Sequence, residues 1–519
     1  MFRVVALRLF LVAIAAGGVG SDRNIASVVA QQPITPGEKT TIWTQPLLPD
    51  GGLDFVHAVN QFGKRRTPPQ RNGIVPLLET LSADDFYDPG SYAALRGELG
   101  LIDPGTASTR FHRPDEAMLT TLHQAANAVW TSQQNTELSN WLANNEKALD
   151  KIDDAVARGG WFYPLIDAHT TLPSGERLSG IYYASLDVLT VIREMAAALA
   201  ARSLMHYGEG QPDKGLRDLV RIHGLVGLLS TGDFNLDILL AAWIDDHARE
   251  VVQALLNSNA LRPADYSALY QAMQKLPTFD PDLGALTMRD MIVSIECLDG
   301  VARGRLSELV YYLRTTNGLI TIPDDPNHYG WMKNLGIRDW DRVARDLRQS
   351  LTEITQAMRA DTFAERRRQL NLHQTGFTEE LSTKEGSPLH QRIKSGQATD
   401  SDRGKAINLL LLSFLFQSTN GSVNAVAKIQ MSRQVALTAL LVEAFRQRSG
   451  GLPDSLDELT PKLLRIVPID IFSSQPIRYQ KHDGGFKLYS VGANSKDLGG
   501  PNPKTPRHDN FGIVVNKGI

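Results

Sequence analysis

The sequence predicts a mainly α-helical protein, in which stacked helical hairpins form a tetratricopeptide-like array followed by a small C-terminal α/β module containing a β-hairpin. Two observations predict this fold class. Apolar residues recur at spacings of three and four through most of residues 115–450, as they do on the buried face of a helix. After residue 451 the pattern changes to short alternating segments beside glycine pairs, which is typical of strands and hairpin turns.

Composition and charge narrow the class of protein. The 519 residues are 42% hydrophobic and 21% charged, close to the averages of soluble globular proteins. Basic and acidic side chains number 54 and 57, which leaves a net charge of −3. Nucleic-acid binding needs a clustered excess of Lys and Arg, so we expect no nucleic-acid partner. The single cysteine, Cys297, excludes an internal disulfide scaffold.

The first thirty residues have the pattern of a signal peptide. Arg3 and Arg8 flank the start of an apolar run at 9–16, which is too short to span a bilayer. Small residues ending at Ala30 fit cleavage before Gln31. We therefore expect residues 1–30 to be removed from an exported, periplasmic or cell-envelope protein without a membrane span in the mature chain. An uncleaved N-terminal anchor is the alternative.

The elements are expected in the following order. A loop-rich N-terminal region at 31–114 contains short helices at 53–62 and 76–81, and a helical array without a strict repeat period covers 115–375. Residues 376–402 are polar and predict a linker or mobile loop, and 403–450 predict a long helix pair at 406–417 and 423–447. The module at 451–519 is expected to hold a short helix at 452–459 and strands at 477–479 and 486–489. The expected helices of the array are at 118–130, 179–207, 213–229, 236–257, 263–275, 288–314, 339–358 and 360–372.

The last segment resembles the C-terminal half of the major pseudopilins of type II secretion systems. The matching motifs are Gly451-Leu-Pro-Asp-Ser-Leu, Val467-Pro-Ile-Asp470, Pro476-Ile-Arg-Tyr479, and Leu488-Tyr-Ser-Val-Gly492 continuing to Asp497-Leu-Gly-Gly500. In pseudopilins this module directly follows a transmembrane assembly helix, whereas here it follows the helical array, and the N-terminus lacks a prepilin-type cleavage motif. A pilus subunit is therefore not expected.

A second resemblance covers more of the chain. The same ending, together with Leu53-Asp-Phe55, residues 204–218 and Asp339-Trp-Asp341, is similar to uncharacterised exported proteins of planctomycete-type bacteria. That family implies no established activity.

The pseudopilin resemblance also implies a candidate calcium site. Calcium-binding pseudopilins hold the ion in the loop after the last matching strand, where this chain has Asn494, Asp497 and Asn502. Calcium requires six to eight oxygen ligands, and only one of these residues is a carboxylate. A hydrogen-bonded turn without a metal or other cofactor is the alternative.

No strong catalytic motif is present, because the chain lacks a Gly-x-Ser-x-Gly elbow, a Walker A loop, a His-Glu-x-x-His helix and a Cys-x-x-Cys pair. A fragment at 233–237 resembles part of an EF-hand loop but lacks key ligands, so it predicts a turn. The cluster Asp245-Asp246-His247 with Glu250 could supply an acid/base pair on a helix, although a solvent-exposed helix face is the simpler interpretation. His206 and His223 are expected to be structural.

One aromatic group is the candidate binding surface: Trp161 and Tyr163, with Tyr182 and Tyr183 close in sequence. Core packing is the simpler interpretation of these residues. The charge run at 365–368 predicts a solvent-facing helix segment without an assigned function.

The sequence therefore favours a non-catalytic exported scaffold or binding protein whose partner is an unidentified envelope protein or polymer. An exported polysaccharide-active hydrolase or lyase that uses groove carboxylates is one alternative, since such enzymes need only two well-placed acidic residues. An accessory component of a type II secretion-like system is the other.

Overall fold

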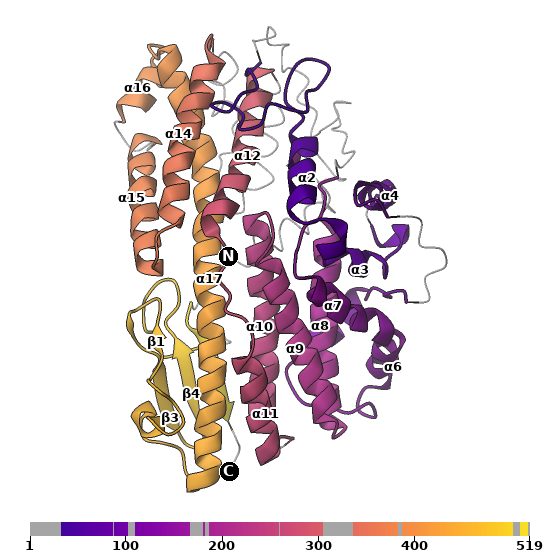
Figure 1. The fold of residues 1–519 in the computed structure, drawn as a ribbon. Helices are drawn as coiled ribbons and strands as arrows, with labels where there is room; N and C mark the ends of the chain where they lie inside the picture. The colour runs from indigo at the N-terminus through magenta and orange to yellow at the C-terminus, as the bar shows by residue number, and fades with distance from the viewer. Residues whose placement is uncertain are drawn as a thin grey trace.

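The computed structural model describes residues 33–86, 88–101, 109–166, 180–181, 186–258, 260–304, 336–381, 387–501 and 509–516. These residues form an elongated bundle of helices with a small sheet at one end (Figure 1). The predicted fold class is confirmed at this level, because the chain is mainly helical and its antiparallel sheet lies near the C-terminus.

The N-terminal region contains short helices, as expected. They are α2 (Phe55–Arg66), α3 (Ile74–Leu78) and α4 (Pro89–Glu98). Asp54 begins α2, since its carboxylate accepts a hydrogen bond from the backbone N–H of His57 at 2.9 Å. Helix α3 is buried along its whole length and packs against α7.

The helices that follow pack only in part against their neighbours in sequence, since α7 contacts α9 and α11 contacts α17 (Asp400–Ser449). Gly210 has a φ of 69° in the short turn between α8 and α9, a conformation that glycine adopts without strain. Helix α9 packs against both α8 and α10, which also contact each other. The helices are α5 (Glu116–Ala125), α6 (Thr136–Asn144), α7 (Glu146–Arg158), α8 (Asp187–Gly208), α9 (Pro212–Leu229), α10 (Asn235–Asn257), α11 (Pro263–Gln274), α12 (Leu283–Ala302) and α14 (Trp340–Met358).

The predicted linker at 376–402 is largely helical, which corrects that expectation. Helix α15 (Phe363–Leu381) extends into it, and α16 (Pro388–Lys394) lies within it. Two contacts stabilise α16: Leu389 packs in a small apolar cluster with residues of the next helix, and Arg392 Nη2 lies 2.6 Å from Asp402 Oδ1. The polar composition of residues 376–402 gave no indication of these stabilising contacts.

The predicted helix pair at 403–450 is one continuous helix, α17 (Asp400–Ser449), of 50 residues. The polar stretch at 418–422 looked like an interruption, but two of its side chains have partners on other helices. Ser418 Oγ donates to Asp290 Oδ2 at 3.2 Å, and Ser422 Oγ lies 3.4 Å from the carbonyl oxygen of Asn235. Tertiary contacts thus override a locally weak helix signal.

Helix α17 connects the helical bundle to the C-terminal sheet. Helices α12, α14, α15 and α16 contact it, as do α10, α11 and strands β4 and β5 (Figure 1). Gly450, with a φ of 77°, ends the helix in the left-handed conformation typical of a C-cap.

The C-terminal module contains a three-stranded antiparallel sheet in the order β3-β4-β5. The predicted hairpin is confirmed as β3 (Arg478–His482) and β4 (Gly485–Ser490), with His482 paired to Gly485 across the turn. Strand β5 (Phe511–Asn516) pairs with β4 and was not predicted. The short helix η5 (Leu456–Leu459) and a two-residue ribbon, β1 (Ile469–Asp470) with β2 (Gln475–Pro476), precede the sheet.

The outer edge of β5 is covered by a ladder of side chains from α10. Arg249 Nη1 donates to the carbonyl of Gly512 at 3.1 Å, and Gln253 Oε1 accepts from the amide of Val514 at 3.1 Å. Asn257 contacts both the carbonyl of Val514 at 3.0 Å and the amide of Asn516 at 2.7 Å. Four helical residues rise about 6 Å and two strand residues about 6.7 Å, so the two spacings match. The helix therefore satisfies an edge that would otherwise be unpaired.

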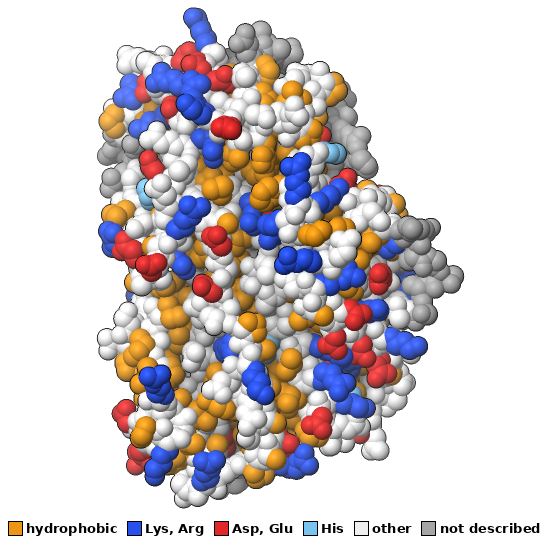
Figure 2. Space-filling model, viewed as in Figure 1, with side chains coloured by type: hydrophobic (Ala, Val, Ile, Leu, Met, Phe, Trp, Pro, Cys, Tyr) orange, Lys and Arg blue, Asp and Glu red, His pale blue; other side chains and the backbone are white. Residues whose placement is uncertain are grey.

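None of the described helices combines the length and apolar character of a bilayer-spanning segment. On the face shown in Figure 2, acidic and basic side chains are intermixed, and apolar strips run between the helices.

Candidate functional site

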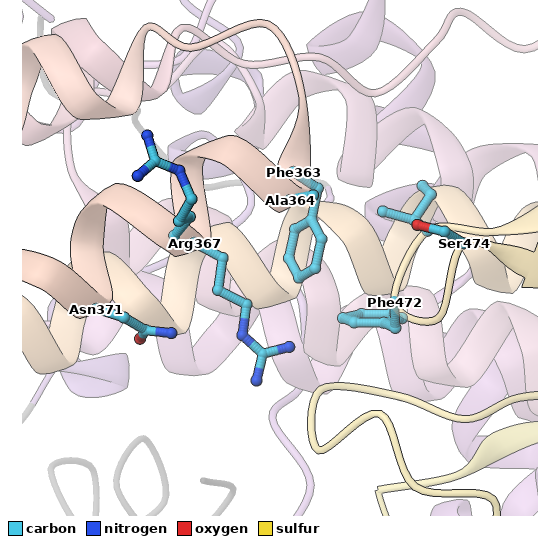
Figure 3. Close-up of a pocket in the computed structure, with 8 residues that line it drawn as sticks. Phe363, Ala364, Arg367, Asn371, Phe472 and Ser474 are labelled. Carbon is cyan, nitrogen blue, oxygen red and sulfur yellow. The ribbon is translucent and has the colours of Figure 1, made fainter.

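A groove lies where α15 meets the turn that follows β1, at the junction of the helical array and the C-terminal module (Figure 3). Its volume is about 310 Å³, at the lower end of the range for small-ligand pockets. No Asp, Glu or His occurs among the residues that line it. The lining residues are Phe363, Ala364, Arg367, Arg368 and Asn371 from α15, and Ile471, Phe472 and Ser474 from the turn.

Two aromatic rings join the two walls. Phe363 projects from the first turn of α15 toward Phe472, and their ring centroids are 5.0 Å apart at an interplanar angle of 76° (Figure 3). Phe472 also meets the ring of Phe511 on β5 edge-to-face, with centroids 6.1 Å apart. Edge-to-face aromatic contacts stabilise such junctions beyond their buried area. The groove thus has an apolar base held by three separate elements.

Asp470 fixes the turn that forms the second wall. Its carboxylate is fully buried and accepts hydrogen bonds from the amide of Phe472 at 3.0 Å and the amide of Val491 at 2.9 Å. Its carbonyl accepts from the amide of Ser474 at 2.8 Å. Ser474 has a φ of 55°, a left-handed conformation that is uncommon for a residue with a side chain. The turn therefore presents Ser474 in one defined orientation.

The two arginines of the groove differ in their partners. Arg368 forms a bidentate pair with Glu365, with distances of 2.8 and 2.6 Å. Arg367 lies with its guanidinium 5.9 Å from the ring centroid of Phe363, and its Nη1 lies 3.4 Å from Ser495 Oγ. Among the described residues, no carboxylate pairs with Arg367. One cation of the groove therefore retains donors for a ligand.

Two of the four residues of the candidate aromatic surface are core residues, in line with the core-packing interpretation. Trp161 and Tyr163 are buried, with 1% and 4% of their surface exposed. The indole Nε1 of Trp161 donates to Asp237 Oδ1 at 3.1 Å. Both residues belong to the core, because a large ring gains most by burial when its polar atom finds a partner. Tyr182 and Tyr183 lie outside the described residues.

The loop predicted as a calcium site does not fit calcium in its described part. Asp497 Oδ1 accepts from Tyr489 Oη at 2.9 Å and from the amide of Gly499 at 3.0 Å, and Oδ2 accepts from Arg478 Nε at 3.1 Å. Hydrogen bonds from Gly499, Tyr489 and Arg478 lower the pKa of Asp497, so its charge is already stabilised without a metal. Asn494 Oδ1 accepts from the amide of Lys496 at 2.8 Å in an Asx turn.

The third predicted ligand, Asn502, lies outside the described residues. Within the part of the chain that the structure describes, no group of three or more His, Cys, Asp or Glu side chains could hold a metal ion.

The EF-hand-like fragment at 233–237 is a turn that begins α10. Asp237 Oδ2 accepts from the amides of Asp233 and Phe234 at 3.0 Å each. Asp233 Oδ1 lies 3.0 Å from Arg66 and 2.8 Å from Arg289. Two guanidinium groups occupy the place where a cation would have to bind.

The acidic cluster on α10 is buried, which corrects the expectation of a solvent-exposed helix face. Asp245 and His247 are 3% and 6% exposed, because α9 and α17 cover this part of α10. The predicted closeness of His247 and Glu250 on this helix is confirmed, since His247 Nδ1 lies 3.3 Å from Glu250 Oε2. The ring of His247 also packs edge-on against Trp243, with centroids 4.3 Å apart.

The carboxylates of Asp245 and Asp246 are adjacent in sequence but have opposite environments. Burial raises the pKa of Asp245 to about 7, and the charge of Asp246 adds to this rise, while a hydrogen bond with Ser432 and the charges of Lys428 and Arg249 oppose it. The imidazole of His223 lies 3.8 Å from the carboxylate of Asp245. Despite its own burial, Asp246 has a lowered pKa, because Lys428 Nζ lies 2.6 Å and Arg249 Nη2 3.3 Å from its carboxylate.

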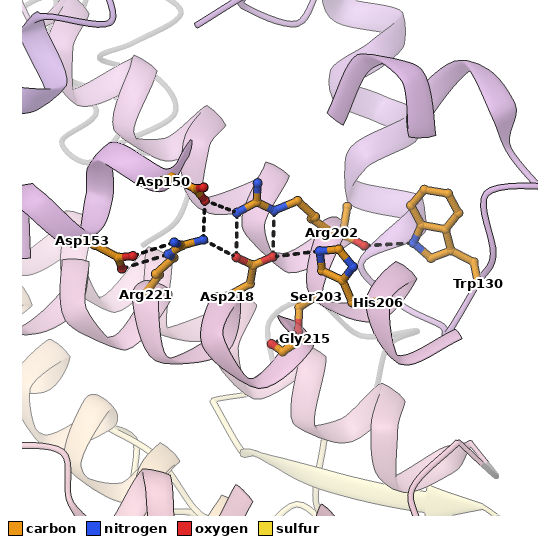
Figure 4. Close-up of polar contacts among 10 residues, drawn as sticks. Trp130, Asp150, Asp153, Arg202, Ser203, His206, Gly215, Asp218 and Arg221 are labelled. Carbon is orange, nitrogen blue, oxygen red and sulfur yellow. Dashed lines mark hydrogen bonds and ion pairs between the residues drawn. The ribbon is translucent and has the colours of Figure 1, made fainter. Parts of the chain in front are cut away.

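A second buried cluster joins α7, α8 and α9 (Figure 4). Asp218 receives two hydrogen bonds from Arg202, both 2.7 Å, and one from Arg221 at 3.0 Å. His206 Nε2 lies 3.9 Å from Asp218 inside the same interface. We call this group the three-helix ion network; its members are Asp150, Asp153, Arg202, Asp218 and Arg221.

Comparison of the chain with protein-family models, curated proteins and solved structures gives no match. The groove was not predicted from the sequence. The charge run at 365–368 was its only local signal, and half of the groove comes from the distant turn at 470–474.

Proposed function

We propose that this chain is a non-catalytic, exported scaffold of the cell envelope that binds a protein or polymer partner. Tetratricopeptide-like stacking of the helical hairpins is part of this proposal, and the packing of the consecutive helices α8, α9 and α10 against one another supports it. Export rests on the signal-peptide pattern of the first thirty residues.

The groove at the junction of α15 and the C-terminal module is the observation that carries the proposal. It combines a partly free cation with aromatic rings, which is typical of sites that bind rather than transform a partner. The acidic side chains best suited to acid/base chemistry, Asp218, Asp245 and Asp246, instead lie in helix interfaces with partners of their own.

A pull-down from the native envelope fraction tests this function. The tagged protein is cross-linked mildly, and mass spectrometry identifies both the partners and the N-terminus of the bait. We expect a stoichiometric partner and a mature chain that begins near Gln31. A bait that retains Met1 would contradict export with cleavage, and the absence of any partner would contradict the scaffold.

A second candidate function is an accessory component of a type II secretion-like system. One observation favours it: the pseudopilin-like module is joined directly to the 50-residue helix α17, as in pseudopilins the module follows its long assembly helix. Stable co-purification with pseudopilins would support this candidate, and recovery of the protein without them would contradict it.

A further inference from the structure

We propose that the groove between α15 and the turn at 470–474 binds an acidic peptide segment of a protein partner, in which a carboxylate adjoins a large apolar side chain. This inference rests on the proposed binding function and specifies the chemistry of its partner. Charge, hydrogen-bonding capacity and apolar surface in the groove each support it.

The charge of the groove favours an anionic ligand. Two guanidinium groups and no acidic side chain line it, and only Arg368 is neutralised, by Glu365. The planar guanidinium of Arg367 can donate two parallel hydrogen bonds to a carboxylate. Its contact with the ring of Phe363 limits its rotamers, so less side-chain entropy is lost when a ligand binds.

Further donors lie on both walls of the groove. Asn371 is on α15 one turn beyond Arg367, and its side chain is exposed. Ser474 on the opposite wall is also exposed. The amide of Asn371 and the hydroxyl of Ser474 can therefore reach a ligand from opposite sides. The left-handed conformation of Ser474 helps to place its side chain on the second wall of the groove. A peptide offers both carboxylate and carbonyl oxygens to such donors.

The apolar surface favours a peptide over a carboxylated polysaccharide. Phe472 is 8% exposed and packs edge-to-face between two other rings, so it does not offer an open ring face for stacking a sugar. The apolar lining residues Phe363 and Ile471 are only partly buried, so their exposed surface can contact an apolar side chain beside the carboxylate.

Fluorescence anisotropy with synthetic peptides tests the proposal on the full-length protein. The probe is a fluorescein-labelled peptide with one Phe between two Asp residues, and the controls replace both Asp by Asn or the Phe by Gly. We expect the probe to bind and each control peptide to bind at least tenfold more weakly. Oligogalacturonate serves as the polysaccharide competitor, and we expect it not to displace the probe.

Two variants link binding to the groove. Arg367→Ala should weaken probe binding at least tenfold, and Arg367→Lys should fall between it and the wild type, because a single ammonium cannot form the bidentate pair. The matched control is Arg345→Ala, which removes the same charge from an exposed position on α14 outside the groove. Equal thermal unfolding midpoints show that all three variants are folded.

The outcomes separate this inference from the proposed function. Probe binding that is absent, insensitive to Arg367→Ala, or replaced by oligogalacturonate binding would overturn the acidic-peptide site. If the wild type and Arg367→Ala capture the same partner from the envelope fraction equally well, the scaffold function stands and the groove assignment fails. Loss of that partner only in Arg367→Ala would support both.

Discussion

Asp218 in the interface of α8 and α9 and Asp245 in the interface of α10 and α17 are almost equally buried, at 1% and 3% exposure. Asp218 meets two guanidinium groups at hydrogen-bonding distance, whereas Asp245 meets a hydroxyl and an imidazole. Burial lowers the pKa of that imidazole, His223, to about 4, so it brings no positive charge near neutral pH. The first interface is therefore built on ion pairs, and the second contains a carboxyl group that holds its proton up to about pH 7.

Asp246 shows that burial alone does not determine whether a carboxyl group is charged or protonated. Asp246 is one residue from Asp245 and has a lowered pKa, because Lys428 and Arg249 contact it. Cations in direct contact, from the same helix or from a helix packed against it, thus determine whether a buried carboxyl group is charged. Five substitutions test this comparison.

The largest effect is expected when the central charge of the three-helix ion network is removed. Asp218→Asn keeps the size of the side chain but leaves Arg202 and Arg221, at 5% and 7% side-chain exposure, with only half-exposed carboxylates as partners. Breaking a buried ion pair costs about 3–5 kcal/mol. Urea unfolding at pH 7 measures this loss; a loss below about 1 kcal/mol would show that the network does not depend on the charge of Asp218.

Lys428→Met should convert Asp246 into a carboxyl group like Asp245. We expect a loss of about 2–3 kcal/mol at pH 7, below the upper limit for a broken buried pair because Arg249 still contacts Asp246. Without Lys428 the pKa of Asp246 should rise, so stability is lost as pH increases and the deficit is larger at pH 7 than at pH 5. Equal deficits at the two pH values would contradict this assignment.

Asp245→Asn should change the pH dependence of stability. The folded protein holds a proton on Asp245 up to about pH 7, whereas the unfolded chain releases it at a much lower pH, so the wild type loses stability as pH rises toward 7. Asparagine stays neutral throughout. From pH 5 to pH 7 the variant should therefore gain about 2 kcal/mol relative to the wild type, which urea unfolding at both pH values measures.

The adjacent substitution Asp246→Asn tests the coupling between the two carboxyl groups. The carboxylate of Asp246 has a lowered pKa and is charged in both the folded and unfolded states above pH 5, so its own titration adds no pH dependence there. Its charge also raises the pKa of Asp245, so from pH 5 to pH 7 the variant should gain stability relative to the wild type, by less than Asp245→Asn. A gain as large as that of Asp245→Asn would contradict burial as the main cause of the raised pKa.

The smallest effect is expected at the exposed edge of the three-helix ion network. Asp153 pairs with Arg221 at 2.6 Å, but 54% of its side chain is exposed, and Arg221 keeps two other carboxylate partners. Asp153→Asn should cost less than about 1 kcal/mol, and salt should reduce this cost further. Urea unfolding with and without added NaCl measures it, and a cost equal to that of Asp218→Asn would contradict the distinction between edge and centre.

Several helices were predictable because their periodicity reports burial directly, whereas α6 and α7 were not predicted. The expected helices at 213–229 and 236–257 correspond to Pro212–Leu229 and Asn235–Asn257. Strand β5 was missed because its pairing with β4 is decided by contacts distant in sequence. The continuity of α17 through 418–422 likewise depends on partners in α10 and α12.

The candidate site was less predictable than the fold. The sequence identified aromatic residues, but it could not distinguish the buried Trp161 from a surface residue, because tryptophan is common in both positions. It identified the charge run containing Arg367 but not the turn that completes the groove. Sites assembled from segments a hundred or so residues apart leave little local pattern to interpret.

The ladder from α10 to β5 determines whether the C-terminal module can exist as a separate fragment. The hydrogen bond between Gln253 and the amide of Val514 joins residues 261 positions apart. A fragment that begins at residue 451 would lack α10 and would expose the backbone groups of Gly512, Val514 and Asn516 to other chains. Exposed strand edges of this kind promote aggregation. Despite its distinct sequence pattern, the module therefore behaves as part of one cooperative folding unit, and transplanting it to another protein would require a substitute for the α10 side chains.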